Sequence, residues 1–448
     1  MTIFSVRQSI NKLYLLYLIL FVYFFITRYN IFPSFSHLLI QLIIFFLSVV
    51  VFNITMRSCK VSTIVWSVFL FHVTSAFLMR MMFIMVYDEY LGYEPVDAEF
   101  YRDIGYDFEN LGYFPMYIWL YINGFFIDDF GYPTIILIFT RLFGVDIGMQ
   151  ILILANGFIV ALGSYYLYKL SMRFVNKDFS KGVAILWGTM PYAIYQTASG
   201  LKENFFVFCV IMSIYHLYQY RERSSFFKLL CFIFWSSTLL FFRLAVALMP
   251  IIAYSIDKIL SFRFVRYNIK KSIFFLTIIC YASFQMITSY MYQIRGYDYE
   301  DQLLRVEQKS ETSGSLGSVG YLLAGLIGPF PNFVASDYDK QQYITLYSFT
   351  PLIKIFVSFF FYYILFLILQ KKYTDLIPAV IFCLLNIVLC VSTLYSFHDR
   401  YQWPHYPILF LISACGYYEY RCSKSRINFY SIYMCAAILI IVLFNFRG

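Results

Sequence analysis

The sequence predicts an all-α, polytopic membrane protein with about 11–13 transmembrane helices and two larger extracytoplasmic loops that carry amphipathic helices. Three observations lead to this fold class. Of the 448 residues, 61% are hydrophobic and only 13% are charged. Apolar stretches of about 17 to 25 residues, long enough to cross a bilayer, recur from one end of the chain to the other. The basic residues fall between these stretches and form no single patch, so no nucleic-acid partner is predicted.

The distribution of charge predicts the side of the membrane that each connecting segment occupies. Seven basic segments hold 21 of the 34 Lys and Arg residues, and the positive-inside rule assigns them to the cytoplasm. The opposite side then holds 20 of the 25 acidic residues. Both charge counts predict the same topology, with a cytoplasmic N-terminus. The first span is predicted to stay uncleaved, because no small-residue cleavage site follows it. The basic segments are Arg7/Lys12, Arg57/Lys60, Lys169 to Lys181, Arg221 to Lys228, Lys258 to Lys271, Lys371/Lys372 and Arg421 to Arg426.

We predict that residues 1–448 form a single integral membrane domain. Several predicted spans are short, and two pairs are joined by tight outer turns, at 199–202 and at 242–243; such spans can be tilted or can line a cavity instead of facing lipid. The predicted spans are 13–27, 36–55, 62–86, 146–172, 181–197, 203–220, 227–241, 244–259, 272–292, 350–370, 374–394, 403–420 and 428–446.

Two predicted outer segments are too long to be simple connectors. The first, residues 87–145, mixes carboxylates with aromatic residues. Its stretches "YFPMYIWLYINGFF" and "YPTIILIFTRLFG" are typical of amphipathic helices that lie along a membrane surface. The second, residues 293–349, has a Ser/Gly-rich centre, which is typical of a flexible connector.

Asp97 is the first candidate catalytic residue. In "DAEFY" it follows Pro95 at the predicted start of a short helix, where a carboxylate can cap free backbone N–H groups. A carboxylate held in a sheltered pocket can also take a proton from a hydroxyl nucleophile. Asp88, at the end of the third span, is the second candidate. We interpret the other acidic residues of this loop as hydrated groups that keep it in water.

Three isolated cations lie at the outer ends of predicted spans: Lys202 in "SGLKENFF", Arg243 in "LLFFRLAVALMP" and Arg400 in "FHDRYQWPHYP". Each long side chain can snorkel to the lipid headgroups. A charge at mid-bilayer costs roughly 2.5 to 3.5 kcal/mol, so charged residues near spans tend to be paired or functional. All three lie on the predicted face that carries Asp97. The ligand that fits them jointly is phosphate, which Arg binds through two hydrogen bonds and Lys as a point charge.

His398 is the fourth candidate phosphate ligand. His398, Asp399 and His405 crowd together and could bind a metal, but Pro404 and Pro407 interrupt the helix. No i, i+4 pair of metal ligands therefore exists. We predict no metal site from the residues, and a divalent metal cofactor is left open but not required.

Arg80 lies deeper in the third span, eight residues before Asp88, and so about 12 Å below it at 1.5 Å per residue. It must face protein or water, and we interpret it as one half of a structural ion pair. His72 and His216 stand alone in apolar runs and are interpreted as packed side chains.

Three stretches, taken in order, carry a resemblance to a known family. "DAEFY" follows an early span and opens a long outer loop. "MPYAIYQTASGLKENFFVFCVIMSIYHLYQY" has paired short spans in which a Lys-acid pair opens the second helix, and an Arg follows in "FFRLAVALMP". "DRYQWPHYPILFLISACG" is a late Arg-Tyr segment with two prolines that enters a membrane helix. Over residues 62–420, this pattern resembles the bacterial multi-spanning glycosyltransferases of the GT-C type and related surface-polysaccharide proteins, including Wzy-type repeat-unit polymerases. The sequence departs from the family pattern in two ways. Two spans precede the one that carries the acidic loop, whereas in many GT-C members that span is the first, and no unambiguous second catalytic acid is identified.

The resemblance implies a sugar or oligosaccharide donor on a polyprenyl phosphate or diphosphate, held in the lipid of a bacterial inner membrane, and a glycan acceptor. Asp97 would activate the acceptor hydroxyl. Lys202, Arg243 and Arg400 would hold the phosphate and stabilise the leaving group, and attack would pass through an oxocarbenium-like state. Nucleotide-sugar donors fit less well, because they are cytoplasmic and the predicted cytoplasmic loops are short and basic.

Two alternatives remain open at this point. A Wzy-type O-antigen or capsule repeat-unit polymerase would use the same donor, with Arg400, His398 and Arg243 as its main residues and Asp97 dispensable. A lipid-linked oligosaccharide flippase or transporter would show two similar halves and charges near mid-membrane. The asymmetric outer loops, and the placement of the charges at one face, favour an enzyme over a transporter.

Overall fold

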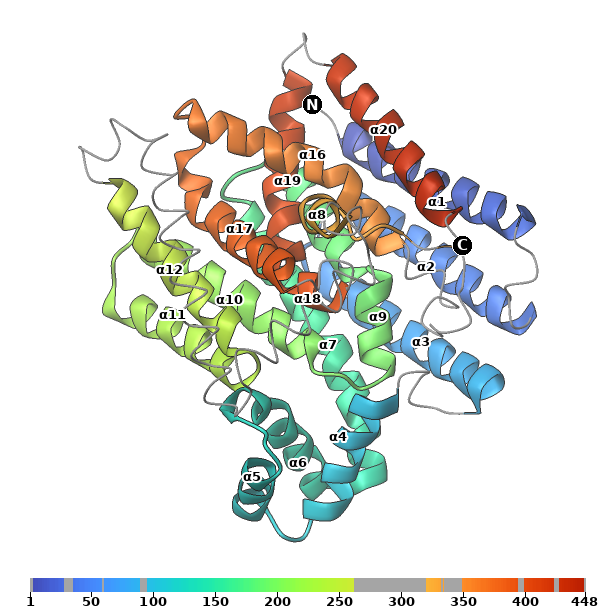
Figure 1. The fold of residues 1–448 in the computed structure, drawn as a ribbon, viewed down its shortest axis with the longest axis vertical. Coiled ribbons are helices and arrows are strands. Elements are labelled where there is room, and N and C mark those ends of the chain that lie inside the picture. The colour runs from blue at the N-terminus through green and yellow to red at the C-terminus, as the bar shows by residue number, and fades with distance from the viewer. Residues whose placement is uncertain are drawn as a thin grey trace.

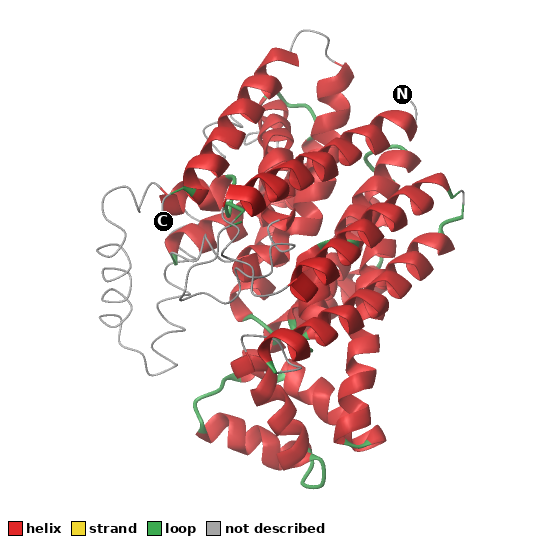
Figure 2. Cartoon of the chain, turned by 90° about the vertical axis from the view of Figure 1, so that its right-hand side faces the viewer, coloured by secondary structure: helices red, strands yellow, loops and turns green. Residues whose placement is uncertain are grey.

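The computed structural model describes residues 3–27, 35–58, 60–88, 95–261, 320–331, 333, 349–393, 399–422 and 427–446. Every regular element in these ranges is a helix, of the α or the 3-10 type (Figures 1 and 2). The predicted all-α fold is therefore confirmed for this part of the chain.

Helices lie at the predicted spans within the described residues, although their ends differ by several residues. The first helix begins at Ile3, well before residue 13, and the predicted span 272–292 lies outside the described residues. The long helices are α1 (Ile3–Thr27), α2 (Phe35–Arg57), α3 (Ser62–Tyr87), α7 (Val145–Ser171), α10 (Glu203–Glu222), α11 (Phe226–Thr238), α12 (Leu244–Ser261), α16 (Phe349–Leu369), α17 (Ile377–Ser392), α19 (Tyr406–Cys422) and α20 (Ile427–Asn445).

The single span predicted at 181–197 is replaced by two helices, α8 (Lys177–Gly188) and α9 (Pro191–Ala198). Pro191 has no N–H to continue the hydrogen bonding of α8, but its fixed φ suits the first position of a new helix. All of α9, and α8 from Phe179 onward, is buried. These two helices therefore form part of the protein interior and do not present a face to lipid.

Five helices in the described ranges are long and apolar enough to cross a membrane: Leu38–Arg57, Ser62–Met85, Val145–Ser171, Phe349–Leu369 and Thr374–Ser392. The protein thus has the helices of a membrane protein. The count of 11–13 spans stays a prediction, because helices such as α10 are covered by protein and carry charges at both ends.

The charged ends of α10 lie far apart. Its 20 residues extend about 30 Å, close to the thickness of a bilayer's hydrocarbon core. At its C-terminal end, Arg221 pairs with Asp257 at 2.9 Å and Glu222 pairs with Arg173 at 3.0 Å. At its N-terminal end, Glu203 joins a second group of charges. The sequence predicts that the first group is cytoplasmic and the second extracytoplasmic.

The first predicted outer segment folds into helices that project from one end of the bundle, at the bottom of Figures 1 and 2. They are α4 (Pro95–Phe108), α5 (Tyr113–Ile122), the 3-10 turn η2 (Ile127–Asp129) and α6 (Gly131–Phe143). Helices are present where the sequence predicted them in this segment. Their amphipathic character and their alignment along a membrane stay predictions. Of the segment 293–349, the structure describes 320–331, 333 and 349. The α4–α6 helices share a small core of Ile104, Phe108, Met116, Leu120 and Leu137.

Candidate functional site

Charged side chains from distant parts of the sequence meet where α4 contacts the bundle. Arg400 donates from Nη2 to Asp97 Oδ2 at 2.5 Å and from Nε to Glu203 Oε1 at 2.5 Å. Arg243 Nη2 lies 4.0 Å from the same Glu203 oxygen. Beside them, Lys202 Nζ lies 3.2 Å from Asp129 Oδ1. We call this group the ionic cluster; its members are Asp97, Asp129, Lys202, Glu203, Arg243 and Arg400.

The local sequence places most of these side chains at the starts of helices. Pro95 opens α4, so Asp97 falls in its first turn. Lys202 precedes α10, and Glu203 is its first residue. Arg243 immediately precedes α12. Helix N-termini present free N–H groups and the positive end of the helix dipole, so this part of the molecule favours bound anions.

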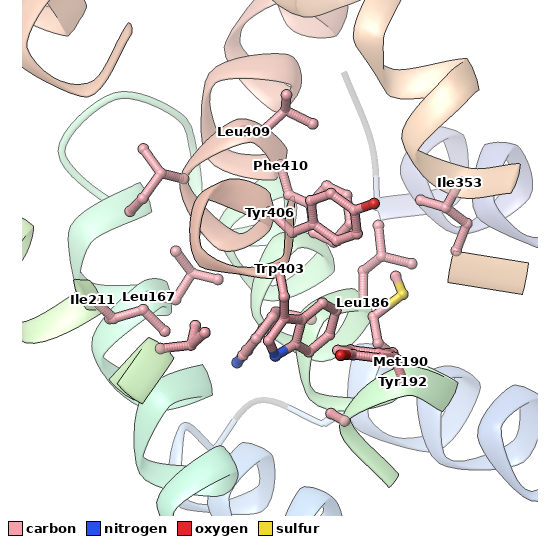
Figure 3. Packing of buried hydrophobic residues seen from close by; sticks show 14 of the residues in the cluster. Leu167, Leu186, Met190, Tyr192, Ile211, Ile353, Trp403, Tyr406, Leu409 and Phe410 are labelled. Carbon is pink, nitrogen blue, oxygen red and sulfur yellow. The ribbon is translucent and has the colours of Figure 1, made fainter. Parts of the chain in front are cut away.

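Arg400 is held in place by the packing of the residues that follow it. It belongs to the short helix α18 (Asp399–Gln402), which continues into the 3-10 turn η7 (Trp403–His405). The buried Trp403 ring lies with its centre 4.5 Å from that of Trp187. It also packs against Tyr192, with ring centres 4.7 Å apart, and against Tyr406 (Figure 3). Because Trp403 packs against rings on several sides, it anchors the chain directly after α18, next to the ionic cluster.

Polar contacts fix the same segment from the other side. Gln402 donates to the Ala324 carbonyl at 3.0 Å and accepts a hydrogen bond from the buried Lys354 of α16. Lys354 also lies 3.4 Å from the Gly325 carbonyl. A buried lysine needs such partners, because an uncompensated charge inside a protein is costly.

The turn before Lys202 is clamped by two side chains. Tyr132 of α6 donates to the Gly200 carbonyl at 2.6 Å, and Arg80 of α3 donates to the Ala198 carbonyl at 2.7 Å. Gly200 has a φ of 67°, a left-handed conformation that glycine adopts readily and that a residue with a Cβ disfavours. This geometry reverses the chain between α9 and α10 and directs Glu203 at Arg400.

Glu203 is the functional candidate that sequence reasoning did not single out. Its side chain is only 2% exposed, whereas that of Asp97 is 42% exposed. Its second oxygen, Oε2, is buried and has no hydrogen-bond partner among the described residues. The sequence signal for Glu203 is its position next to Lys202 at the start of a long apolar helix. It contributed to the prediction only through the Lys-acid pair of the family resemblance.

The electrostatics of the ionic cluster shift the pKa of one member, Arg400, and of one neighbour, Tyr101. Burial opposes the charge of Arg400, but Glu203 and then Asp97 outweigh burial, so the pKa of its guanidinium lies above the ordinary value. Burial, followed by the carboxylates Glu203 and Asp97, raises the pKa of Tyr101 well above 10.0. Tyr101 therefore remains a neutral phenol beside the ionic cluster.

Arg243 is oriented by aromatic rings as well as by charge. Its guanidinium carbon lies 4.7 Å from the centre of the Tyr401 ring and 5.8 Å from that of Phe206. Such cation–π contacts favour a defined position of the guanidinium. Because Tyr401 follows Arg400 directly, both arginines depend on the placement of α18.

Two predicted site residues are not placed in the ionic cluster. Asp88 is exposed at the end of α3, in a left-handed conformation with a φ of 54°. It makes no ion pair with any member of the ionic cluster. His398 lies outside the described residues. Arg80, interpreted as half of an ion pair, hydrogen bonds to the neutral oxygens of Ala198 and Gln150.

The described residues include no group of three or more His, Cys, Asp or Glu side chains that could hold a metal ion. His405 is buried, with Nδ1 2.6 Å from the Asn386 amide oxygen. His72 contacts the Gly188 carbonyl and Thr197, so it is packed as predicted.

Comparisons with protein-family models, with curated proteins and with solved structures find no match for this chain.

Proposed function

We propose that this chain is an integral membrane glycosyltransferase that transfers a sugar or oligosaccharide from a polyprenyl phosphate or diphosphate to an acceptor hydroxyl at the extracytoplasmic face. The observation that carries the proposal is the direct contact of Arg400 with Asp97 and Glu203. It unites a half-exposed carboxylate with cations suited to phosphate, in a protein with membrane-spanning helices.

In the proposed reaction, the acceptor oxygen forms a bond to the anomeric carbon of the donor sugar. The bond between that carbon and the carrier phosphate oxygen breaks, and the electron pair leaves with the phosphate. Asp97 takes the acceptor proton, and Arg400 and Arg243 stabilise the charge that develops on the leaving phosphate.

The charge balance of the ionic cluster suggests an order of events. Its three carboxylates match its three cations, so an incoming phosphate must replace a carboxylate. Asp97 is the more exposed partner of Arg400, while Glu203 is buried. We infer that donor phosphate takes the place of Asp97 on Arg400 and frees Asp97 to act as the base. Proton abstraction would then require a bound donor.

The test replaces the chromosomal gene with variants and follows carrier-linked sugars. We expect Asp97→Asn to lower product formation by about 100-fold or more, because it removes a general base, and to accumulate unused donor. Asp107→Asn is the matched control, since Asp107 lies on the same helix with its side chain exposed. Full activity of Asp97→Asn, at a normal level of inserted protein, would exclude Asp97 as the base.

A repeat-unit polymerase is the second candidate, favoured by the sharing of Glu203 between Arg243 and Arg400. In that reaction the arginines act on the donor, and Asp97 only positions Arg400. The carrier-linked sugars of a deletion strain separate the candidates. Truncated sugars indicate a monosaccharide transferase, complete single units at the outer face indicate a polymerase, and complete units held inside indicate a flippase.

A further inference from the structure

The carboxylates of the ionic cluster come from two parts of the fold. Asp97 and Asp129 belong to the helices that project from the end of the bundle, in α4 and η2 (Figure 1). Glu203 and the three cations belong to the bundle, near the starts of α10 and α12 and in α18. The projecting helices therefore supply one carboxylate to Arg400 and a second to Lys202.

The two contacts made by the projecting helices are the accessible ones. The side chains of Asp97 and Asp129 are 42% and 32% exposed, whereas that of Glu203 is 2% exposed. Ion pairs between partly exposed side chains are weak, because water and salt screen them. An incoming anion can therefore compete with both exposed carboxylates for their cations, while Glu203 stays between the two arginines.

The two exchangeable positions lie close together. Lys202 and Glu203 are consecutive residues, and Arg400 Nε lies 2.5 Å from Glu203 Oε1. Tyr101 lies beside both positions: burial is the main cause of its raised pKa, and the three carboxylates of the ionic cluster raise that pKa further. A ligand with two adjacent anionic groups can therefore reach both cations.

The position of Asp129 is set by backbone packing against the bundle. The turn η2 contacts the 3-10 turn η3 (Leu239–Phe241), which leads into Arg243. A Cβ added at Gly131 would lie 2.8 Å from the Phe241 carbonyl oxygen, so this close approach requires glycine. Asp129 is therefore placed by the same corner of the bundle that places Arg243.

A sugar-linked polyprenyl diphosphate has the charge that such an exchange requires. Each of its two phosphates carries one negative charge at neutral pH, as does each carboxylate that it would replace. The exchange therefore leaves the charge beside Lys202 and Arg400 unchanged, and both side chains are suited to phosphate. A sugar-linked polyprenyl monophosphate has one negative charge and would replace only one carboxylate.

We propose that the donor is a sugar-linked polyprenyl diphosphate that replaces both exposed carboxylates of the ionic cluster. Its sugar-bearing phosphate binds Arg400 in the place of Asp97. Its carrier-side phosphate binds Lys202 in the place of Asp129. This inference rests on the proposed transfer reaction at the same site.

The cations are distributed as the reaction of a diphosphate requires. Transfer breaks the bond between the anomeric carbon and the oxygen of the sugar-bearing phosphate, which keeps the electron pair and gains one negative charge. The acceptor proton goes to the released Asp97. Arg243 and Arg400 share one carboxylate oxygen, so both are placed at the phosphate that gains this charge.

The test measures binding to the full-length protein in detergent. Two farnesyl probes carry N-acetylglucosamine, one through a diphosphate and the other through a monophosphate. We expect the Kd of the diphosphate probe to be about tenfold lower, the contribution of one hydrogen bond to a charged group. Lys202→Gln should remove this preference by weakening only the diphosphate probe, and Arg400→Gln should weaken both. Lys372→Gln, at an exposed position outside the ionic cluster, is the control and should change neither.

A carboxylate variant guards against loss of folding. Asp129→Asn removes the competitor of the carrier-side phosphate, so it should tighten the diphosphate probe about threefold, the effect of an exposed ion pair. It should leave the monophosphate probe unchanged. Asp107→Asn, exposed on α4, is the matched control. Weaker or unchanged binding of the diphosphate probe by Asp129→Asn would overturn the exchange.

The same measurements separate this inference from the proposed function. Equal binding of the two probes to the unmodified chain, with both weakened by Arg400→Gln, would overturn the diphosphate donor and leave the proposed transferase intact. Binding of neither probe would overturn the proposed transferase itself. Binding of UDP-N-acetylglucosamine or of inorganic diphosphate as tightly as the diphosphate probe would overturn the polyprenyl carrier.

Discussion

Arg400 connects two carboxylates because a guanidinium presents N–H donors on more than one edge. Its Nε and Nη2 atoms reach Glu203 and Asp97 at the same time, which the single ammonium of a lysine would do less well. The sequence indicated that an isolated arginine and an acidic motif would share one face. It did not indicate that Glu203 would lie between Arg243 and Arg400, because Glu203 has the ordinary appearance of an acidic residue in a first helical turn.

We predict that Glu203→Gln destabilises the protein. The substitution removes the charge that Arg400 and Arg243 share, and the loss of a hydrogen bond to a charged group costs about 1.5–3 kcal/mol. Thermal unfolding of the purified protein in detergent should show a lower Tm. Glu99→Gln, on α4 and outside the ionic cluster, serves as the control. An unchanged Tm for Glu203→Gln would show that this buried contact adds nothing to stability.

Among the helices, hydrophobic length was the most informative feature of the sequence. It located α2, α3, α7 and α16 to within a few residues. It did not predict the break at Pro191, because a proline inside an apolar run is compatible with either a kinked span or two separate helices. The burial of α8 and α9 depends on their neighbours, which the local sequence does not specify.

The packing of α19 against α16 gives a prediction for these elements. A Cβ added at Gly416 would lie 2.2 Å from the Phe360 carbonyl oxygen, a distance that forces the two helices apart. We expect Gly416→Val to destabilise the protein by about 1–3 kcal/mol and to displace α18, which precedes α19. Ala414→Val, at a half-buried position of the same helix, is the control in thermal unfolding. Equal stability of both variants would contradict close helix packing at Gly416.

Across the whole molecule, the two charged groups at the ends of α10 allow the predicted orientation to be tested. Asp107 lies on the predicted extracytoplasmic side and Lys372 on the cytoplasmic side, and both are exposed. In spheroplasts, a membrane-impermeant maleimide should label Asp107→Cys before permeabilisation and Lys372→Cys only afterwards, relative to the unmodified chain. The reverse pattern would place the ionic cluster in the cytoplasm and exclude an extracytoplasmic reaction.

The sequence by itself determined the all-helical class, most helix positions and the separation of basic from acidic segments, since these follow from local hydrophobicity and charge. It also identified Asp97, Lys202, Arg243 and Arg400 as residues that could act together. Only the tertiary structure decided which of these residues touch and that Glu203 joins them. It also decided that Asp88 stays apart from the ionic cluster. The physical reason is that ion pairs between residues hundreds of positions apart depend on helix packing. That packing is set here by contacts such as those of Trp403 and Tyr132, which no local pattern encodes.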